Sequence, residues 1–230
     1  MSFGKKYNVD FVMCIDVTGS MSPIIDEVKK TALTLPSTFL ATMDEYGRHV
    51  DSLRIKVIAF GDYEYDENPM AESEFFTADQ AGEFETYVNN LVPSGGGDIP
   101  ENALEALALA FKSDWDESAF RHVTLLFTDA PALPLGERAE CPKYPTGMPA
   151  TLDELMDWYQ NPADQEIELK LKRQATRLVL FSPHAEPWDD ISDWERYETG
   201  PVYHVPIALG AGALEIDIND IVGAMVHSSI

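Results

Sequence analysis

The sequence is poor in cysteine, since its 230 residues include only Cys14 and Cys141. Two cysteines are too few for the disulfide framework of a small secreted domain, and they do not form a paired metal-binding motif. Because Cys14 lies inside an apolar run, we expect it to be a buried free thiol. Cysteine usage of this kind is typical of a reducing compartment, so we predict a cytoplasmic protein.

Positive charge is also scarce, because 16 Lys and Arg stand against 40 Asp and Glu and give a formal net charge of -24. Such a surface repels phosphate backbones, so we expect no nucleic-acid partner. It suits cations and basic partners, although solubility alone also accounts for acids that are widely spread. No stretch approaches the ~18 continuous apolar residues of a membrane span, and we expect no membrane association.

What the chain does contain is an alternation of strand-like and helix-like segments. Apolar or alternating runs predict strands at 7–16, 53–60, 121–127, 177–181 and 201–207, with a short edge strand at 71–77. Helical patterns cover 20–44, 78–91, 101–112, 151–174 and 216–227, with a break expected at Pro36 and a candidate break at Asn161-Pro162. A short helix is also expected before the last strand, and a proline-rich loop occupies 131–149.

This alternation favours a mostly parallel sheet with helices on both faces. We therefore predict an α/β fold of the Rossmann-like, doubly wound type, with one short antiparallel edge strand. No linker or repeat divides the chain, so we predict a single domain over residues 1–230.

Acids and hydroxyls follow the predicted strands. Asp16, Thr18 and Ser20 follow the first strand in FVMCIDVTGSM, while Asp62 and Asp129 follow two others. The carboxyl ends of parallel strands share one edge of the sheet, which is where ligands bind. Packed acids repel one another and usually need a cation, and ligands that are all oxygens select Mg²⁺, Ca²⁺ or Mn²⁺. The pattern predicts a divalent-cation site, with Mg²⁺ favoured because the protein ligands are few.

Simpler roles are open for several of these residues. Ser20 or Ser22 could cap the helix that follows, although a cap does not explain an acid at the end of a buried strand. Asp129 could be an ordinary turn acid, and Asp62 in GDYEYDE could be a solvated loop acid. His184, in the loop after the strand predicted at 177–181, could line the same rim or simply pack.

The segment Asp16-Val17-Thr18-Gly19-Ser20-Met21 resembles the D-x-S/T-G-S-M signature of von Willebrand factor A domains. LLFTDAP resembles the strand-ending T-D pattern of the same family, and a glycine-rich loop lies between the two motifs. The resemblance covers nearly the whole chain. It implies the fold of that family and a metal-ion-dependent adhesion site, in which Asp16, Thr18 and Ser20 hold Mg²⁺ and Asp129 acts through water.

The glycine-rich loop GGGDIPE departs from the family pattern. The family usually has a threonine after the paired glycines, and the distance to Ala103-Leu104 places Asp98 at that position. The loop looks like that of a subset which includes domains linked to atypical alpha-kinases. As a direct ligand, Asp98 would tighten cation binding and weaken the capture of a partner's carboxylate. Alternatively, it caps the following helix. Both roles stay open, and they are compatible.

Catalytic motifs are missing, because the sequence has no G-x-S-x-G, H-E-x-x-H, Walker A or Rossmann G-x-G-x-x-G pattern. We therefore predict a non-enzymatic, cation-binding interaction module. The resemblance implies a protein partner in assembly or regulation, such as a kinase, a phosphatase or a ring-shaped ATPase. The alternative is a metal-dependent hydrolase of phosphoesters, in which a metal-bound water is the nucleophile.

Overall fold

A computed structural model describes residues 7–95, 100–194 and 202–206. The glycine-rich loop position Asp98 and the helix predicted at 216–227 lie outside these residues. The centre of the molecule is a six-stranded sheet in the order β3-β2-β1-β4-β5-β6. The strands are β1 (Asn8–Asp16), β2 (Ser52–Phe60), β3 (Met70–Glu72), β4 (Arg121–Phe127), β5 (Thr176–Ser182) and β6 (Val202–Pro206).

All neighbouring strands are parallel except β2 and β3, which are antiparallel. The chain builds outward from β1 to one edge, then crosses back to β4 and builds toward the other edge, which is the doubly wound arrangement. The predicted fold class, with its antiparallel edge strand, is confirmed. Because β1 is central, the residues that follow it lie where the strand order reverses.

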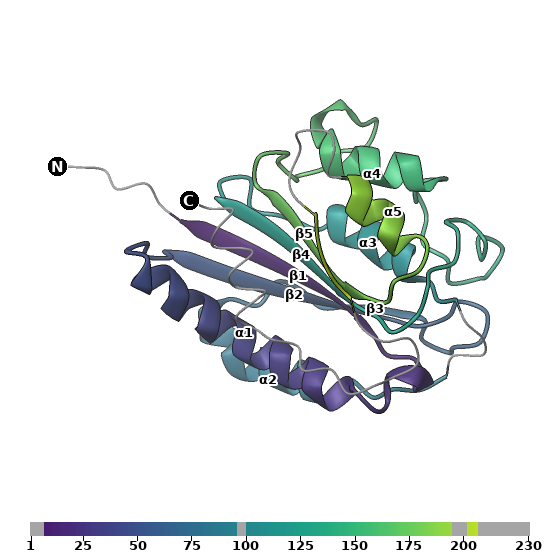
Figure 1. Cartoon of the computed structure of the whole chain (residues 1–230), viewed down its shortest axis with the longest axis horizontal. Helices are drawn as coiled ribbons and strands as arrows, with labels where there is room; N and C mark the ends of the chain where they lie inside the picture. The colour runs from purple at the N-terminus through teal and green to yellow at the C-terminus, as the bar shows by residue number, and fades with distance from the viewer. Residues whose placement is uncertain (1–6, 96–99, 195–201, 207–230) are drawn as a thin grey trace.

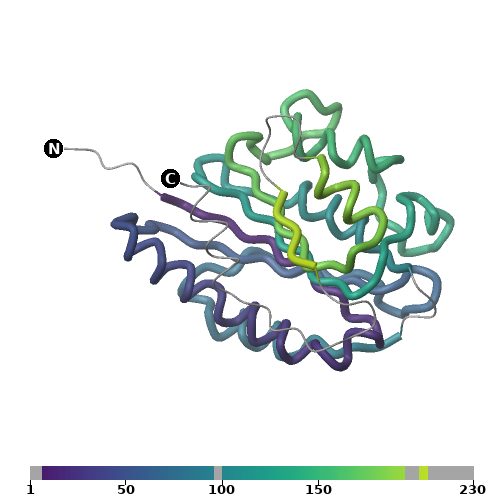
Figure 2. Tube along the Cα trace, in the orientation of Figure 1, coloured from purple at the N-terminus to yellow at the C-terminus, as the bar shows by residue number. Residues whose placement is uncertain are grey.

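Helices cover both faces of the sheet, as Figures 1 and 2 show. One face carries α1 (Ile25–Glu45) and α2 (Ala81–Asn89), and the other carries α3 (Ala103–Phe111), α4 (Leu152–Gln160) and α5 (Trp188–Asp193). Residues of β1 alternate between the two cores: Met13 and Ile15 pack on the side of α1, and Val12 and Cys14 on the side of α3. Cys14 is a buried free thiol, as predicted.

The predicted break at Pro36 and several predicted element bounds are wrong. Pro36 does not interrupt α1, because the buried stripe that includes Val28, Leu35 and Phe39 holds the helix against the sheet on both sides of the proline. The helix predicted at 151–174 ends at Gln160, and only a short 3₁₀ turn (Pro162–Asp164) follows. A proline just after a helix cannot continue its hydrogen bonding, so this break stops the helix instead of kinking it.

The edge strand β3 is shorter than the predicted 71–77. At Ser73 the backbone N–H still donates to Val57 O at 2.9 Å, but the Ser73 hydroxyl, in place of a backbone carbonyl, accepts from Val57 N at 2.9 Å. The strand direction is resumed only at the isolated bridge between Ile55 and Phe76. The hydrophobic pattern of the sequence does not reveal that a serine hydroxyl replaces a backbone carbonyl as acceptor. The end of the strand was therefore not predicted.

The helix predicted from Glu101 begins instead at Ala103, with Asn102 at the N-cap position. Glu101 pairs with the 131–149 loop: its N–H donates to Pro131 O at 3.1 Å, and its carbonyl accepts from Leu133 N at 2.8 Å. Glu101 therefore precedes the first turn of α3. Its backbone anchors the long loop beside the start of α3.

The 131–149 loop is also tied to α3 through a buried acid. The Tyr144 hydroxyl donates to Glu105 Oε1 at 2.8 Å, and Asn102 Nδ2 donates to Glu105 Oε2 at 3.3 Å. Burial raises the pKa of Glu105, and these hydrogen bonds oppose the rise. The loop is thus a packed part of the fold.

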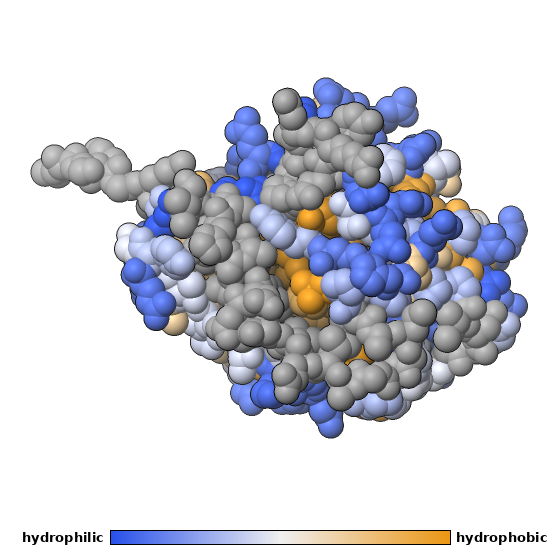
Figure 3. Space-filling view, viewed as in Figure 1, coloured by the Kyte–Doolittle hydropathy of each residue, from blue (hydrophilic) through white to orange (hydrophobic). Residues whose placement is uncertain are grey.

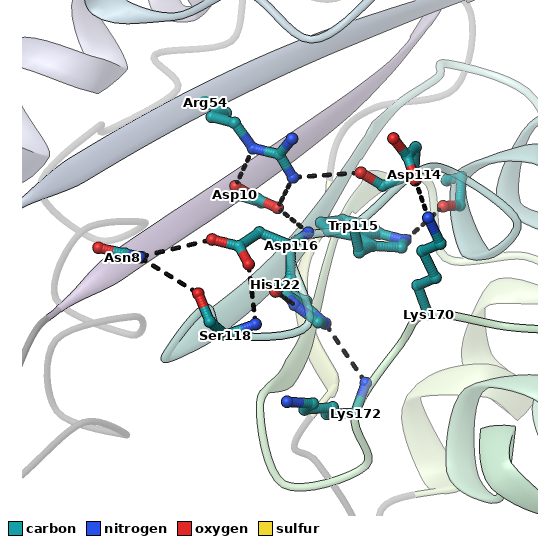
Figure 4. A network of polar contacts seen from close by, with 11 residues as sticks. Asn8, Asp10, Arg54, Asp114, Trp115, Asp116, Ser118, His122, Lys170 and Lys172 are labelled. Atoms are coloured by element: carbon teal, nitrogen blue, oxygen red, sulfur yellow. Dashed lines mark hydrogen bonds and ion pairs between the residues drawn. The ribbon is translucent and has the colours of Figure 1, made fainter.

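A polar network closes the opposite edge of the sheet, where β1 begins (Figure 4). The buried Asp10 carboxylate accepts from Arg54 Nε at 2.9 Å and from Asp116 N at 2.7 Å. His122, on β4, contacts the Asp116 carbonyl through Nε2 at 2.9 Å and accepts from Lys172 N at 3.3 Å. These contacts join β1, β2, β4 and two loops, so we assign the network to the stability of the fold.

Candidate functional site

The first loop after β1 folds around the carboxylate of Asp16, which is fully buried. Asp16 Oδ1 accepts hydrogen bonds from the Thr18 backbone N–H at 2.9 Å and from the Thr18 hydroxyl at 2.7 Å. Met21 N donates to Thr18 O at 3.1 Å and begins the 3₁₀ turn Gly19–Met21. The D-V-T-G-S sequence therefore makes a compact turn with its polar side chains on the inside.

The acid after β4 joins this loop through Ser20. The Ser20 hydroxyl donates to Asp129 Oδ1 at 2.8 Å, across 109 positions of sequence. Thr128 completes the link, because its hydroxyl donates to Asp16 Oδ2 at 2.7 Å. The structure thus brings together four of the predicted ligands, namely Asp16, Thr18, Ser20 and Asp129.

The hydroxyls of Thr18 and Ser20 lie 3.1 Å apart. Each hydroxyl has one proton, and each also has a carboxylate oxygen within 2.8 Å that can only accept when it is ionised. When each hydroxyl donates its proton to a carboxylate, no proton is left between Thr18 Oγ1 and Ser20 Oγ. The lone pairs of these two oxygens then face each other. Such a contact is favourable when a cation lies between the oxygens, and neighbouring ligands of octahedral Mg²⁺ are about 2.9 Å apart.

The second oxygen of Asp129, Oδ2, is buried and has no hydrogen-bond partner among the described residues. A buried carboxylate oxygen without a partner is costly, and it calls for a water or an ion. Together with the paired hydroxyls, it completes a set of donors made only of oxygen. This donor set fits a hard divalent cation.

The electrostatics of the two acids agree with this fit. Burial raises the pKa of Asp16 to about 6, and the nearby charge of Asp129 adds to the rise, while hydrogen bonds from Thr18 and Thr128 oppose it. Burial also raises the pKa of Asp129. Burial disfavours the charged forms of these two adjacent acids. A positive charge nearby would stabilise the charged forms.

Helix capping does not account for the first loop. The N-cap positions are Thr18 for the 3₁₀ turn and Ile24 for α1, and neither makes a side-chain capping hydrogen bond. The Ser20 hydroxyl is directed to Asp129 instead. The cation-site reading of this loop therefore has more support than the capping alternative.

Two glycines let the glycine-rich loop approach the first loop. Ser94 N donates to Val17 O at 2.9 Å, and a Cβ on Gly19 would lie 3.1 Å from the Gly95 carbonyl. Gly95 has a φ of +66°, and a Cβ there would lie 1.4 Å from Asp66 Oδ1. The described start of this loop thus lies directly against the D-V-T-G-S turn, while Asp98 is outside the described residues.

Asp62 is buried after β2, but its contacts are those of a turn. Its Oδ1 accepts from Glu64 N at 2.6 Å and Tyr65 N at 3.3 Å, and Arg138 lies 3.8 Å from its Oδ2. The expectation of a solvated loop acid is therefore wrong. No contact among the described residues joins Asp62 to the Asp16 and Asp129 pair, so its predicted rim role has no support from the geometry.

His184 lies in an exposed position after β5, with 70 % of its side chain accessible, and it pairs with Asp189 at 2.9 Å. The described contacts do not connect it to Asp16 or Asp129. Trp188, four residues on, is fully buried, and its indole N–H donates to Ala130 O at 2.9 Å. This tryptophan supports the loop that carries Asp129.

Sequence reasoning missed the role of Thr128 as the donor to Asp16. The signal was present in the T-D strand ending, because a hydroxyl one residue before the acid faces the opposite way and can reach the neighbouring strand's end. Trp188 could not be assigned, since its partner lies 58 positions away.

The chain is similar to proteins of a known family. The family model of the von Willebrand factor A domain matches residues 10–136, which is more than half of the chain. A curated relative, the alpha-protein kinase vwkA of Dictyostelium discoideum, is 28% identical over 156 residues. This match covers 64% of the chain but only 23% of the kinase, so the chain spans less than a quarter of that relative's length.

One solved structure shows the same fold over nearly its whole length. The VWA domain of SpRpn10 aligns with a TM-score of 0.52 and 11% identity over 95% of both chains. The pilus adhesin SpaC from Lactobacillus rhamnosus GG aligns with a TM-score of 0.41 and 16% identity, over 55% of this chain and 15% of the adhesin. Within the described residues, no helix is long and apolar enough to cross a membrane.

Proposed function

Because the chain belongs to the von Willebrand factor A domain family, whose members are protein-interaction and adhesion modules, we propose that it is a divalent-cation-binding interaction module. Its role is the assembly or regulation of a protein partner in the cytoplasm. Asp16, Thr18, Ser20 and Asp129 would hold the cation, and Mg²⁺ suits their oxygen donors best.

One observation carries the proposal. Thr18 and Ser20 place their hydroxyl oxygens 3.1 Å apart while each hydroxyl also contacts a carboxylate, and the second oxygen of Asp129 is buried without a partner among the described residues. These oxygens converge at the edge of the sheet where the strand order reverses. A positive charge nearby would stabilise such a cluster.

The cation would serve as a contact point and as support for the surrounding loops. Both loops that hold it also accept hydrogen bonds from their neighbours: the Ser94 backbone N–H donates to Val17 O, and the Trp188 indole N–H donates to Ala130 O. Loading the site would therefore stiffen a surface made of three loops. A partner that recognises the loaded arrangement would bind in a cation-dependent way.

We propose that the chain has no catalytic activity of its own. In the described residues, the Ser20 hydroxyl is bonded to an acid and has no histidine base beside it. The second candidate, a metal-dependent phosphoester hydrolase, relies on the same acids. It would require turnover of a generic phosphoester with Mn²⁺ that is lost together with the cation site.

The proposed location and partner class have indirect support. Cys14 and Cys141 are both free, which suits a reducing compartment. The matched relative is named as an alpha-protein kinase, and a kinase is therefore a suitable partner class to test first. A phosphatase or a ring-shaped ATPase would recognise a cation-loaded surface by the same chemistry.

The Asp16→Asn variant tests the proposal. A cation that binds only the folded protein stabilises it by about 2.7 kcal/mol at 100 times its Kd, which corresponds to a rise of about 5–10 °C in Tm for a chain of this size. We expect Mg²⁺ to raise the Tm of the wild type in this way and to have little effect on the variant. Partner capture from the native cells should be lost with a chelator and with the same variant.

Asp26→Asn is the matched control, because Asp26 is an exposed acid in the first turn of α1 and its loss changes the net charge equally. Its Mg²⁺ response should equal that of the wild type. Asp129→Asn provides a second site variant if Asp16→Asn folds poorly. An unchanged Mg²⁺ response in Asp16→Asn would refute the site, and Mn²⁺-dependent phosphoester turnover would favour the hydrolase.

A further inference from the structure

A second cluster of potential metal ligands, which shares no residue with the oxygen site, lies beyond the end of β5. His184 lies in the loop after β5, Asp189 is in α5, and His204 is in β6. One ligand atom from each of the three side chains lies within 4.8 Å of the others. From this geometry we propose that the His184–Asp189–His204 cluster is a binding site for Zn²⁺ or a similar transition-metal ion.

The hydrogen bonding of His204 prepares one of its nitrogens to bind a metal. Its Nε2 lies 3.1 Å from the Ser182 carbonyl oxygen and 3.1 Å from the Ser182 hydroxyl. In the tautomer with the proton on Nε2, the ring donates to the carbonyl, which can only accept. A neutral imidazole with a protonated Nε2 presents a bare lone pair at Nδ1. Metal-binding histidines usually donate their other N–H to a carbonyl or a carboxylate in this manner, which fixes the ring.

Burial also fixes His204 in place, because only 8% of its side chain is exposed. Its bare Nδ1 lies 3.8 Å from Asp189 Oδ1, and His184 Nδ1 lies 2.9 Å from the same oxygen. Donor atoms around a tetrahedral Zn²⁺ with bonds of 2.0–2.1 Å are separated by about 3.3 Å. The two observed separations lie on either side of this value, so small movements of exposed side chains would complete the site.

The metal would take the place of a proton at His184. In the structure the Asp189 carboxylate accepts from His184 Nδ1, and the bound ion would displace that proton and hold both atoms. His184 and Asp189 are 70% and 49% exposed, so they can adjust, while His204 provides the rigid ligand. The chain thus offers two nitrogens and one oxygen, with a further position open to water or to a partner's side chain.

The chemistry of this cluster differs from that of the oxygen site. Imidazole nitrogens favour Zn²⁺, Cu²⁺ and Ni²⁺, whereas Mg²⁺ favours oxygen ligands. Aspartates of the same segment, WDDISD, add negative charge nearby, and the net charge of -24 attracts any cation. The inference does not depend on the proposed Mg²⁺ site, because the two clusters share no residue.

A zinc titration of the untagged full chain, after chelator treatment, tests the cluster. We expect calorimetry to show one Zn²⁺ bound in the micromolar range in the presence of excess Mg²⁺. Co²⁺ should give the visible absorption of a four-coordinate site. His184→Ala and Asp189→Asn should each weaken Zn²⁺ binding at least about 10-fold, since each removes a ligand atom.

The chain contains a matched control for this experiment. Asp44 and His49 form an exposed pair at 3.4 Å with the same five-residue spacing, and the described residues place no second histidine beside it. His49→Ala should leave Zn²⁺ affinity unchanged, and so should Asp16→Asn. The proposal is overturned if the wild type binds no Zn²⁺, or if His184→Ala and Asp189→Asn, folded by circular dichroism, retain wild-type affinity.

Discussion

Buried titratable side chains are the residues whose chemistry depends most on their surroundings. Asp16 and His122 lie at opposite ends of the sheet, and burial disfavours the charged form of each. For the acid, the proposed cation would supply a compensating positive charge. For the histidine, hydrogen bonds to Asp116 and from the Lys172 backbone suit the neutral ring, so no ion is needed. The same burial therefore supports a proposed cation site at Asp16 and a structural role for His122.

His122 should make stability fall in mild acid. Burial lowers its pKa in the folded state, so the unfolded chain binds more protons once the pH falls through the ordinary value near 6.5. Between pH 7.5 and 5.5, the free energy of unfolding of the wild type should fall by about 1 kcal/mol more than that of His122→Gln. Urea unfolding at the two pH values measures this difference.

His49→Gln is the control for this prediction, because His49 is exposed. Its pH dependence should follow that of the wild type. Parallel curves for the wild type and His122→Gln would show that the histidine is not held neutral.

Each secondary-structure element is shaped by a balance between local preference and packing. In α1, a buried stripe on the sheet side outweighs a proline at position 36. In α4, the sequence Asn161-Pro162 does end the helix, because the residues that follow contribute few buried side chains. Thr151 begins the same helix by accepting a hydrogen bond from Glu154 N at 3.1 Å. Proline therefore acts differently in the two helices according to the packing around it.

Pro36→Ala should stabilise the protein. Alanine restores a backbone N–H that can donate to the carbonyl of residue 32, and its helix propensity is higher, although the unfolded chain gains freedom. The expected gain in the free energy of unfolding is about 1–2 kcal/mol by urea denaturation. Ser37→Ala, one residue along, should change it by no more than about 0.5 kcal/mol. A loss of stability in Pro36→Ala would mean that packing of the proline ring is worth more than the hydrogen bond.

The whole molecule carries a strong negative charge on a largely polar surface. Hydrophilic side chains cover most of the described part of the face in Figure 3, and apolar areas are smaller. With 40 acids against 16 bases, like charges repel across the folded domain. This field attracts cations in general, and the two clusters of ligands would select particular ones by geometry.

Salt should therefore stabilise the protein without any specific binding. Raising NaCl from about 10 mM to 0.3 M shortens the Debye length from about 30 Å to under 8 Å and screens the repulsion. We expect Tm to rise by about 2–4 °C. KCl should act equally, while MgCl₂ at the same ionic strength should exceed both in the wild type and match them in Asp16→Asn. A Tm that is independent of NaCl would contradict this account of the charge.

Local patterns along the chain predicted the alternation of strands and helices, the buried central strand, and four candidate oxygen ligands at two strand ends. These depend on local periodicity and on loop residues next to strands, which the chain order shows directly. The tertiary structure alone decided that Thr128 bonds to Asp16, that Asp62 forms a turn, and that His184, Asp189 and His204 meet. Such contacts depend on the order of strands in the sheet and on how loops pack, and these bring together residues that are far apart in sequence.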